Sequence, residues 1–427
     1  MFSTLKNAWS IPELRKKLIF TALILLLYRV GNVIPVPGID VGVLGTYFET
    51  TLSSTILGLY NAMSGSAFSQ ATVLALSIQP YINASIIIQL LTIAIPALER
   101  IAKEEGEEGK KKIERITRYT TVGLGLLMGF AYYMMLRNYS SQGLTILKDE
   151  GFLSAVVIIL AFTAGSSVVM WLGEQINEFG IGNGISVILF ANIISGIPGA
   201  VGTMTTMLWW EILIAVVGIA ALIIFIVFVN DAERRIPVQY AKRVVGRKMY
   251  GGQNTNLPIK VSMSGVLPVI FAQSITSLPA TICAFMGITA NSGSWWYDNL
   301  WSANSWAYAV MYGLLIFFFS WFYSTIQYDP VEIANNLKKN GGFIPGFRPG
   351  KPTADFIKKV IGKIVVFGAV YLAIVALLPI IAGHVMTSVQ NLAIGGTSVI
   401  IVVGVALETV KTLEAQMMMR HYKGFLY

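Results

Sequence analysis

The sequence predicts an all-α membrane protein that crosses the bilayer ten times, and three observations predict it. Of the 427 residues, 55% are hydrophobic and only 12% are charged, whereas soluble domains carry about 25% charged residues. Apolar runs long enough to span a bilayer as helices recur along the whole length. Every Lys and Arg except Arg29, Arg137 and Lys148 falls into segments that ten alternating helices place on one side.

The apolar runs give the positions of the spans. The ten predicted spanning helices cover residues 18–36, 71–96, 117–138, 152–173, 184–203, 211–230, 261–288, 305–328, 362–383 and 393–412. The first run follows Lys16 and Lys17 but lacks a small-residue cleavage pattern, so we interpret it as a retained helix and not as a signal peptide. Because basic residues mark cytosolic loops, both termini are predicted to be cytosolic.

Ten helices divide into two halves of five, residues 1–203 and 204–427, which face the membrane in opposite directions. A faint internal echo supports a repeat, because "PYINASI" (80–86) and "PVIFAQSI" (268–275) share Pro-x-Ile-x-Ala in the second helix of each half. Inverted repeats place the working site at the interface between the halves. The sequence therefore predicts two inverted, pseudo-symmetric halves with a central site.

Two predicted cytosolic loops, at about 231–260 and 329–361, carry much of the basic charge. The first has extended Ile, Val and Tyr patches and a Gly-Gly break, which predict a protruding hairpin. The second places Arg348 between turns in "PGFRPG". An alternative explanation of the charge is that both loops are solvated and only set the orientation of the chain in the membrane. Their Pro, Gly and aromatic residues favour a fixed shape, which can dock an acidic protein surface or RNA phosphates.

The predicted membrane interior offers little chemistry. Transporters and proton pumps carry buried carboxylates or histidines in their helices. Here Arg29 lies about two-thirds along the first predicted helix, and Glu211 and Glu408 lie near helix ends; an interfacial position or a single structural partner explains each of them. Cys283 is the only cysteine and the two histidines stand apart, so no disulfide, metal site, cofactor site or catalytic constellation is legible. An enzyme is therefore not indicated.

The second and seventh predicted helices pair apolar side chains with polar stripes. The polar stripes are Ser85, Gln89 and Thr92 in the second helix and Gln273, Ser274, Ser277 and Thr281 in the seventh. Such residues form hydrogen bonds between membrane helices, and each bond stabilises the helix pair by about 1 kcal/mol or less. Weak contacts of this kind suit an interface that opens. Ordinary helix packing explains the spacing equally well. From the residues alone a channel and an inverted-repeat secondary transporter both stay open, and a lipid-embedded scaffold is a third reading.

Long motifs extend the reading further. They are "IPVPGID" (34–40), "IQPYINASIIIQLL" (78–91), "GIGNGISVILF" (180–190), "ERRIPVQYAKR" (233–243), "GVLPVIFAQSI" (265–275), "NLKKNGGF" (336–343), "PGFRPGKPT" (345–353) and "GGTSVIIVV" (395–403). With these motifs the chain resembles, essentially from end to end, the SecY/Sec61-alpha family of protein-translocation channel subunits. The resemblance implies a clamshell of two halves around a pore, with a lateral gate between the second and seventh helices.

The resemblance also implies site residues, carried over motif by motif. The implied pore ring is Ile78, Ile82, Ile185, Leu189, Ile270 and Ile401, and the implied gate residues are Ser85, Gln89, Thr92, Gln273, Ser274 and Ser277. Leu189 stands where the family frequently has Ile. The segment "ILGLYNAMSGSAFSQ" (56–70) is apolar but too short to cross a bilayer. It resembles the plug, at about 55–67, with Ile56, Leu57, Leu59, Tyr60 and Met63 against the ring.

The function implied is a protein-conducting channel in a bacterial plasma membrane. It would translocate unfolded secretory proteins and release transmembrane segments sideways into lipid. The implied partners are the small subunits SecE and SecG, the motor ATPase SecA, the ribosome, signal-sequence-bearing polypeptides and membrane lipid. The expected motor or ribosome contacts are Arg235, Lys242, Arg243, Arg247, Lys248 and Arg348. No cofactor is expected, and the energy would come from the motor, the ribosome or the membrane potential.

Overall fold

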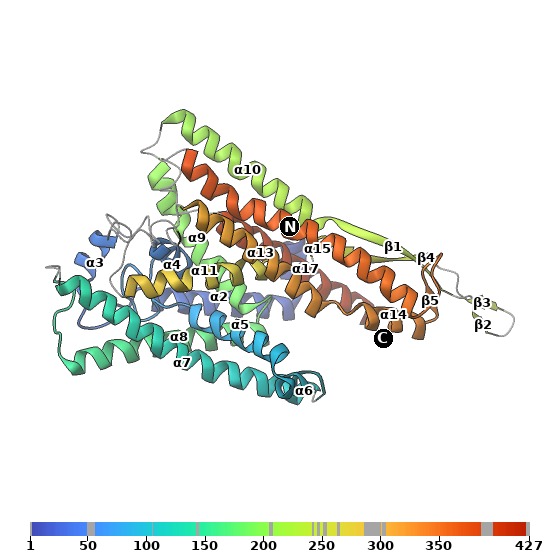
Figure 1. Cartoon of the computed structure of the whole chain (residues 1–427), viewed down its shortest axis with the longest axis horizontal. Coiled ribbons are helices and arrows are strands. Elements are labelled where there is room, and N and C mark those ends of the chain that lie inside the picture. The colour runs from blue at the N-terminus through green and yellow to red at the C-terminus, as the bar shows by residue number, and fades with distance from the viewer. Residues whose placement is uncertain are drawn as a thin grey trace.

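The computed structural model describes most of the chain as helix (Figure 1). The described residues are 2–48, 56–104, 106–141, 145–204, 208–240, 243–245, 248–250, 254–262, 265–285, 300, 305–385 and 396–423. The helices are α1 Phe2–Ser10, α2 Pro12–Gly31, α3 Val41–Tyr47, α4 Ile56–Ser64, α5 Gln79–Ala94, α6 Pro96–Glu104, α7 Gly106–Ser141, α8 Phe152–Phe179, α9 Gly184–Met204, α10 Trp209–Asp231, α11 Leu267–Phe285, α13 Trp306–Gln327, α14 Pro330–Lys339, α15 Lys351–Val385 and α17 Gly396–Lys423. The prediction of a mostly helical membrane protein is confirmed.

Five helices in the described part are long and apolar enough to cross a membrane, or six when one bent pair counts as a single span. The five lie in 106–140, 152–179, 209–231, 306–339 and 351–382. Of these, α10 is the least buried, with only 11% of its apolar window covered by the rest of the chain. Each of the ten predicted spans contains a described helix, while the count of ten membrane crossings stays a prediction.

The second predicted span, 71–96, is wrong at its start. Residues 71–78 form turns, and helix α5 begins only at Gln79. The reason is Pro80, which is tolerated in a first helical turn but would break a helix that began at 71. At the other end Pro96 stops α5, and α6 continues at an angle of 105°. Proline thus defines both ends of this helix.

Helix packing follows the chain order in both parts of the molecule. Helix α5 packs on α7 and α7 on α8, while α11 packs on α13 and α13 on α15. Helices α5 and α11 also pack against each other. One large apolar cluster joins these helices to α2, α4, α9 and α17. The hydrophobic core is therefore continuous across the two predicted halves.

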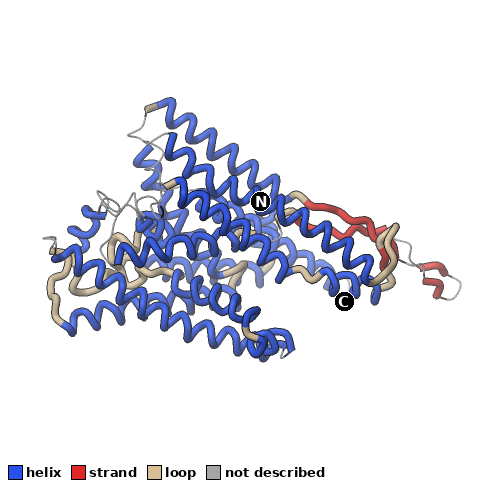
Figure 2. The backbone as a smooth tube through the Cα atoms, viewed as in Figure 1, coloured by secondary structure: helices blue, strands red, loops and turns tan. Residues whose placement is uncertain are grey.

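The strands project from one end of the helical bundle (Figure 2). They are β1 Glu233–Tyr240, β2 Arg243–Val245, β3 Lys248–Tyr250, β4 Asn254–Lys260 and β5 Gly342–Phe343. Strand β1 pairs antiparallel with β4, from Glu233 opposite Lys260 to Gln239 opposite Asn254, which confirms the predicted hairpin. On its other edge β1 pairs with β5. The sheet therefore ties the two predicted cytosolic loops together, which the sequence did not indicate.

Candidate functional site

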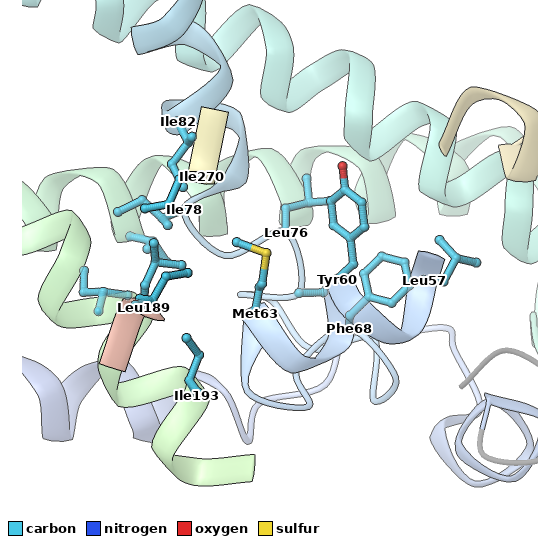
Figure 3. Close-up of a cluster of buried hydrophobic side chains, with 14 of the residues drawn as sticks. Leu57, Tyr60, Met63, Phe68, Leu76, Ile78, Ile82, Leu189, Ile193 and Ile270 are labelled. Carbon is cyan, nitrogen blue, oxygen red and sulfur yellow. The ribbon is translucent and has the colours of Figure 1, made fainter. Parts of the chain in front are cut away.

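Helix α4 packs against α9 and α11, in the part of the bundle that lies away from the sheet (Figure 1). Its side chains Leu57, Tyr60 and Met63 are 1%, 8% and 6% exposed. The other two predicted plug side chains, Ile56 and Leu59, lie outside the described side chains. The Met63 thioether lies beside a group of branched aliphatic side chains, and Tyr60 and Leu57 follow along α4 away from that group (Figure 3). A short helix thus lies with its described apolar side chains buried inside the bundle.

The six predicted ring residues come from α9, α11, α17 and the start of α5. Ile78, Ile82, Leu189, Ile270 and Ile401 are all 3% exposed or less, whereas Ile185 is partly buried. All six belong to, or pack against, the same apolar cluster as Met63. The structure therefore places the predicted ring residues and α4 in one continuous apolar cluster.

Local backbone rules position the two members of this group on α9. Asn183 precedes the helix, and its Oδ1 accepts hydrogen bonds from the N–H groups of Ile185 and Ser186 at 3.1 and 3.4 Å. This arrangement caps the first turn. A Cβ at Gly184 would lie 1.9 Å from the Gly173 carbonyl oxygen on α8, so only glycine fits there. The tight α8–α9 connection fixes where Ile185 and Leu189 point.

Polar side chains connect α4 to both α5 and α11. The Tyr60 hydroxyl lies 3.2 Å from the Ser277 hydroxyl on α11. The Met63 sulfur accepts hydrogen bonds from the Nε2 groups of Gln79, at 3.2 Å, and Gln273, at 3.3 Å. A thioether is a weak acceptor, so these contacts hold α4 without binding it tightly.

The two predicted polar stripes differ in burial and in their hydrogen-bond partners. On α5, Ser85 is half-buried, Gln89 is exposed, and the Thr92 hydroxyl donates to the carbonyl of Ile88 in its own helix. On α11, Ser274 is buried and its carbonyl accepts from Ser277. The polar contacts from α11 in this region run instead to α4. The spacing showed the stripes, but it did not reveal that the stripe on α11 contacts α4.

A buried polar cluster beside α4 was missed by the sequence reading. Asn192 on α9 is completely buried, and its Nδ2 group lies within hydrogen-bond distance of the Met63 carbonyl, the Tyr28 hydroxyl and the Ser77 hydroxyl, which share its two protons. Arg29 donates to the carbonyl of Ala191, which gives it the single structural partner that the sequence suggested. The signal in the sequence was the amide side chain of Asn192, which stands in an otherwise apolar stretch of α9.

The predicted basic contact residues lie at the end of the molecule that carries the sheet. Arg235 is on β1, with its side chain 70% exposed and 3.8 Å from the Glu233 carboxylate. Arg348 is exposed between Gly346 and Gly350, and its carbonyl accepts from the Thr353 hydroxyl at 2.8 Å. Of the remaining four, Lys242 and Arg247 lie outside the described residues, and the side chains of Arg243 and Lys248, on β2 and β3, are not described.

This geometry defines a class of protein. It is a helical bundle of membrane type, and its own short helix fills its apolar interior. The comparisons with known proteins narrow it. The family model described as SecY matches residues 72–410. A protein translocase subunit SecY from Streptomyces scabiei is 42% identical, with 100% of both chains covered. The protein of that name from Thermotoga maritima is 42% identical, with 100% of this chain and 98% of the relative covered. The chain belongs to the SecY family.

Solved structures show the same fold. One described as "The structure of a protein conducting channel" has a TM-score of 0.66 and 19% identity, over 94% of this chain and 92% of the other. Another concerns the plug domain of the SecY protein and the closed state of its translocation channel; it has a TM-score of 0.64 and 20% identity over the same shares. As a member of this family, the chain is a multi-pass membrane protein.

Proposed function

We propose that this chain is the protein-conducting subunit of a Sec-type translocation channel in a bacterial plasma membrane. It passes unfolded secretory proteins across the membrane and releases apolar segments sideways into lipid. The observation that carries this proposal is helix α4, a short helix seated against buried aliphatic side chains from α5, α9, α11 and α17. A self-contained stopper in an apolar centre is the arrangement expected of a pore that must be closed when idle.

The proposed architecture has ten spanning helices, both termini in the cytosol, and two halves at residues 1–203 and 204–427. The matching order of packing, α5–α7–α8 and α11–α13–α15, supports two related halves. Figure 1 supports the orientation, because α6, α14 and the sheet lie towards one end while α3 lies towards the other. The predicted cytosolic basic loops are thus gathered at a single end of the bundle.

We assign the pore ring to the six aliphatic residues named above. A narrow apolar ring cannot replace the hydration shell of an ion, so it resists ion flow by dewetting. Branched aliphatic side chains also pack around a passing chain of any sequence. The plug is assigned to α4 and its flanks, about 55–67. The lateral gate is assigned to the contact between α5 and α11, where a segment rich in Leu or Phe gains free energy by moving into lipid.

The proposed partners are SecE, SecG, the motor SecA, the ribosome and signal-sequence-bearing polypeptides. Two solved structures of the same fold are described as Sec61 in a canine ribosome-channel complex, and as an idle yeast Ssh1 complex bound to the yeast 80S ribosome. The sheet that joins β1 to β5 supports a docking role, because it holds the loop of Arg235 and the loop of Arg348 in one unit with its own buried cluster. A rigid basic tip can dock on acidic protein or RNA phosphates.

The secondary transporter is not favoured, since the full-length relatives are translocase subunits. The same membership places the chain among translocation channels and not among enzymes. The experiment that tests the proposal reconstitutes the chain with its small subunits in vesicles and adds the motor, ATP and a precursor protein. Protease protection of the precursor that requires both ATP and the motor is the expected result. An ATPase-dead motor is the matched control. No protected precursor at saturating motor would contradict the proposal.

A further inference from the structure

The polar cluster beside α4 joins four separate segments around one amide. Asn192 Nδ2 on α9 lies 2.8 Å from the Met63 carbonyl oxygen, 2.9 Å from the Tyr28 hydroxyl and 3.2 Å from the Ser77 hydroxyl. The Tyr28 and Ser77 hydroxyls are themselves 3.1 Å apart. Asn192, Tyr28 and Ser77 are 1% exposed or less, and Met63 is 6% exposed. Each bond therefore forms away from water, where a lost donor is costly.

The chemistry of the partners fixes the direction of the amide. A backbone carbonyl only accepts hydrogen bonds, so the NH₂ end of Asn192 must face Met63. The Met63 carbonyl is in the last turn of α4, where carbonyls have no partner within their own helix. The next carbonyl, that of Ser64, accepts from Asn32 Nδ2 at 3.3 Å. Two asparagines thus cap the C-terminal end of the helix.

The segment that follows α4 is strained. Ser66, Ala71 and Ser77 have positive φ angles of 69°, 42° and 49°, and non-glycine residues avoid this region at a cost on the order of 1–3 kcal/mol each. Such residues persist only where surrounding contacts hold them. Ser77 is held by the same Asn192 amide that holds Met63. One side chain therefore secures both ends of a strained segment.

We propose that Asn192 is the latch that keeps α4 seated, a positioning residue that sets how readily the idle channel opens. This inference rests on the proposed function, and it adds the residues that carry the closed state on the side of α2 and α9. The contact is only moderately stable, because Asn192 Oδ1 is buried without a hydrogen-bond partner among the described residues. An unsatisfied buried acceptor offsets part of what the three bonds contribute.

The test measures hydrogen exchange of the α4 backbone amides in the full chain, reconstituted in lipid with its small subunits and with no precursor or motor present. Asn192→Leu removes the donors but keeps most of the volume. It should speed exchange over Ile56–Ser64 by about tenfold. Tyr28→Phe removes only one hydroxyl and keeps the ring, so it tests the same cluster with little risk to folding. It should give a smaller increase in the same residues.

Thr121→Val is the matched control, because Thr121 is also completely buried and its hydroxyl bonds only to the Thr117 carbonyl of its own helix. It should leave α4 exchange unchanged. Unchanged α4 exchange in both Asn192→Leu and Tyr28→Phe would overturn the latch. Equal acceleration in α15 would also overturn it, since that signals general loosening. Both outcomes leave the channel proposal intact, because that proposal is tested separately by ATP-dependent precursor protection.

Discussion

The contact between Tyr60 on α4 and Ser277 on α11 gives a sharp test of how the idle centre is held shut. The two hydroxyl oxygens lie 3.2 Å apart, and the Ser277 hydroxyl also donates to the Ser274 carbonyl at 2.9 Å. A serine hydroxyl has one proton, so Tyr60 is the donor in the bond between the two. Tyr60→Phe therefore removes one hydrogen bond and leaves Ser277 with a partner.

The expected magnitude follows from this geometry. A buried neutral hydrogen bond contributes about 0.5–1.5 kcal/mol net, and no unsatisfied group remains to add a further penalty. About 1 kcal/mol shifts the balance between seated and displaced α4 by roughly fivefold. The assay is single-channel recording of the reconstituted idle complex. Its open probability should rise by about that factor, since the proposed plug role requires α4 to leave its seat before ions pass.

Tyr371→Phe is the control for the chemical change itself. Tyr371 is 3% exposed on α15, and its hydroxyl has no hydrogen-bond partner among the described atoms. Its removal should leave the open probability unchanged. If Tyr60→Phe and Tyr371→Phe behave alike, the contact between α4 and α11 does not help to close the centre, and the reasoning fails.

Further predictions concern the ring, the loops and the sheet. Ile82→Asn places an amide at a position that is 3% exposed, which costs about 1–3 kcal/mol of stability. It should raise the ion leak of the idle channel and admit precursors with defective signal sequences. Normal rejection of such precursors would refute the ring assignment. Arg348→Glu should slow motor-driven export severalfold without added ion leak, because it reverses an exposed charge far from the centre; normal export at saturating motor would remove that contact. Val238→Asp buries a carboxylate under the sheet, where Val238 is 2% exposed, and should speed protease cleavage of the 233–260 loop while idle conductance stays normal; equal cleavage rates would contradict the small core.

The sequence predicts most where one physical signal dominates. Apolar runs located the helices of spanning type in the described part of the chain, and extended Ile, Val and Tyr patches with a Gly-Gly break predicted a hairpin, which the pairing of β1 with β4 confirms. The start of the second span was predicted too early because average apolarity continues through 71–78, whereas the backbone chemistry of Pro80 makes the helix begin at Gln79. Pairing of β1 with β5 joins residues about 100 positions apart, and no local pattern reports such a contact.

The site divides in the same way. The aliphatic ring residues were assigned from motifs, and the ring stays a prediction, with which their burial in one apolar cluster agrees. Asn192 was not found, because a single amide in an apolar helix is common in membrane helices and usually serves packing. Its role depends on three partners that the sequence separates by 115 to 164 positions. Only the folded arrangement brings them together.

The contacts on the two sides of α4 differ in strength, and this difference predicts an order of events. Towards α11, the helix is held by a hydroxyl pair and by a thioether that accepts from Gln273, and a thioether is a weak acceptor. Towards α9, a backbone carbonyl accepts from the Asn192 amide inside a fully buried cluster. Separation of α5 from α11 therefore breaks the weaker set first. We expect α4 to stay with α9 until the Asn192 bond also breaks, so that gate opening and plug release are two steps with separate thresholds.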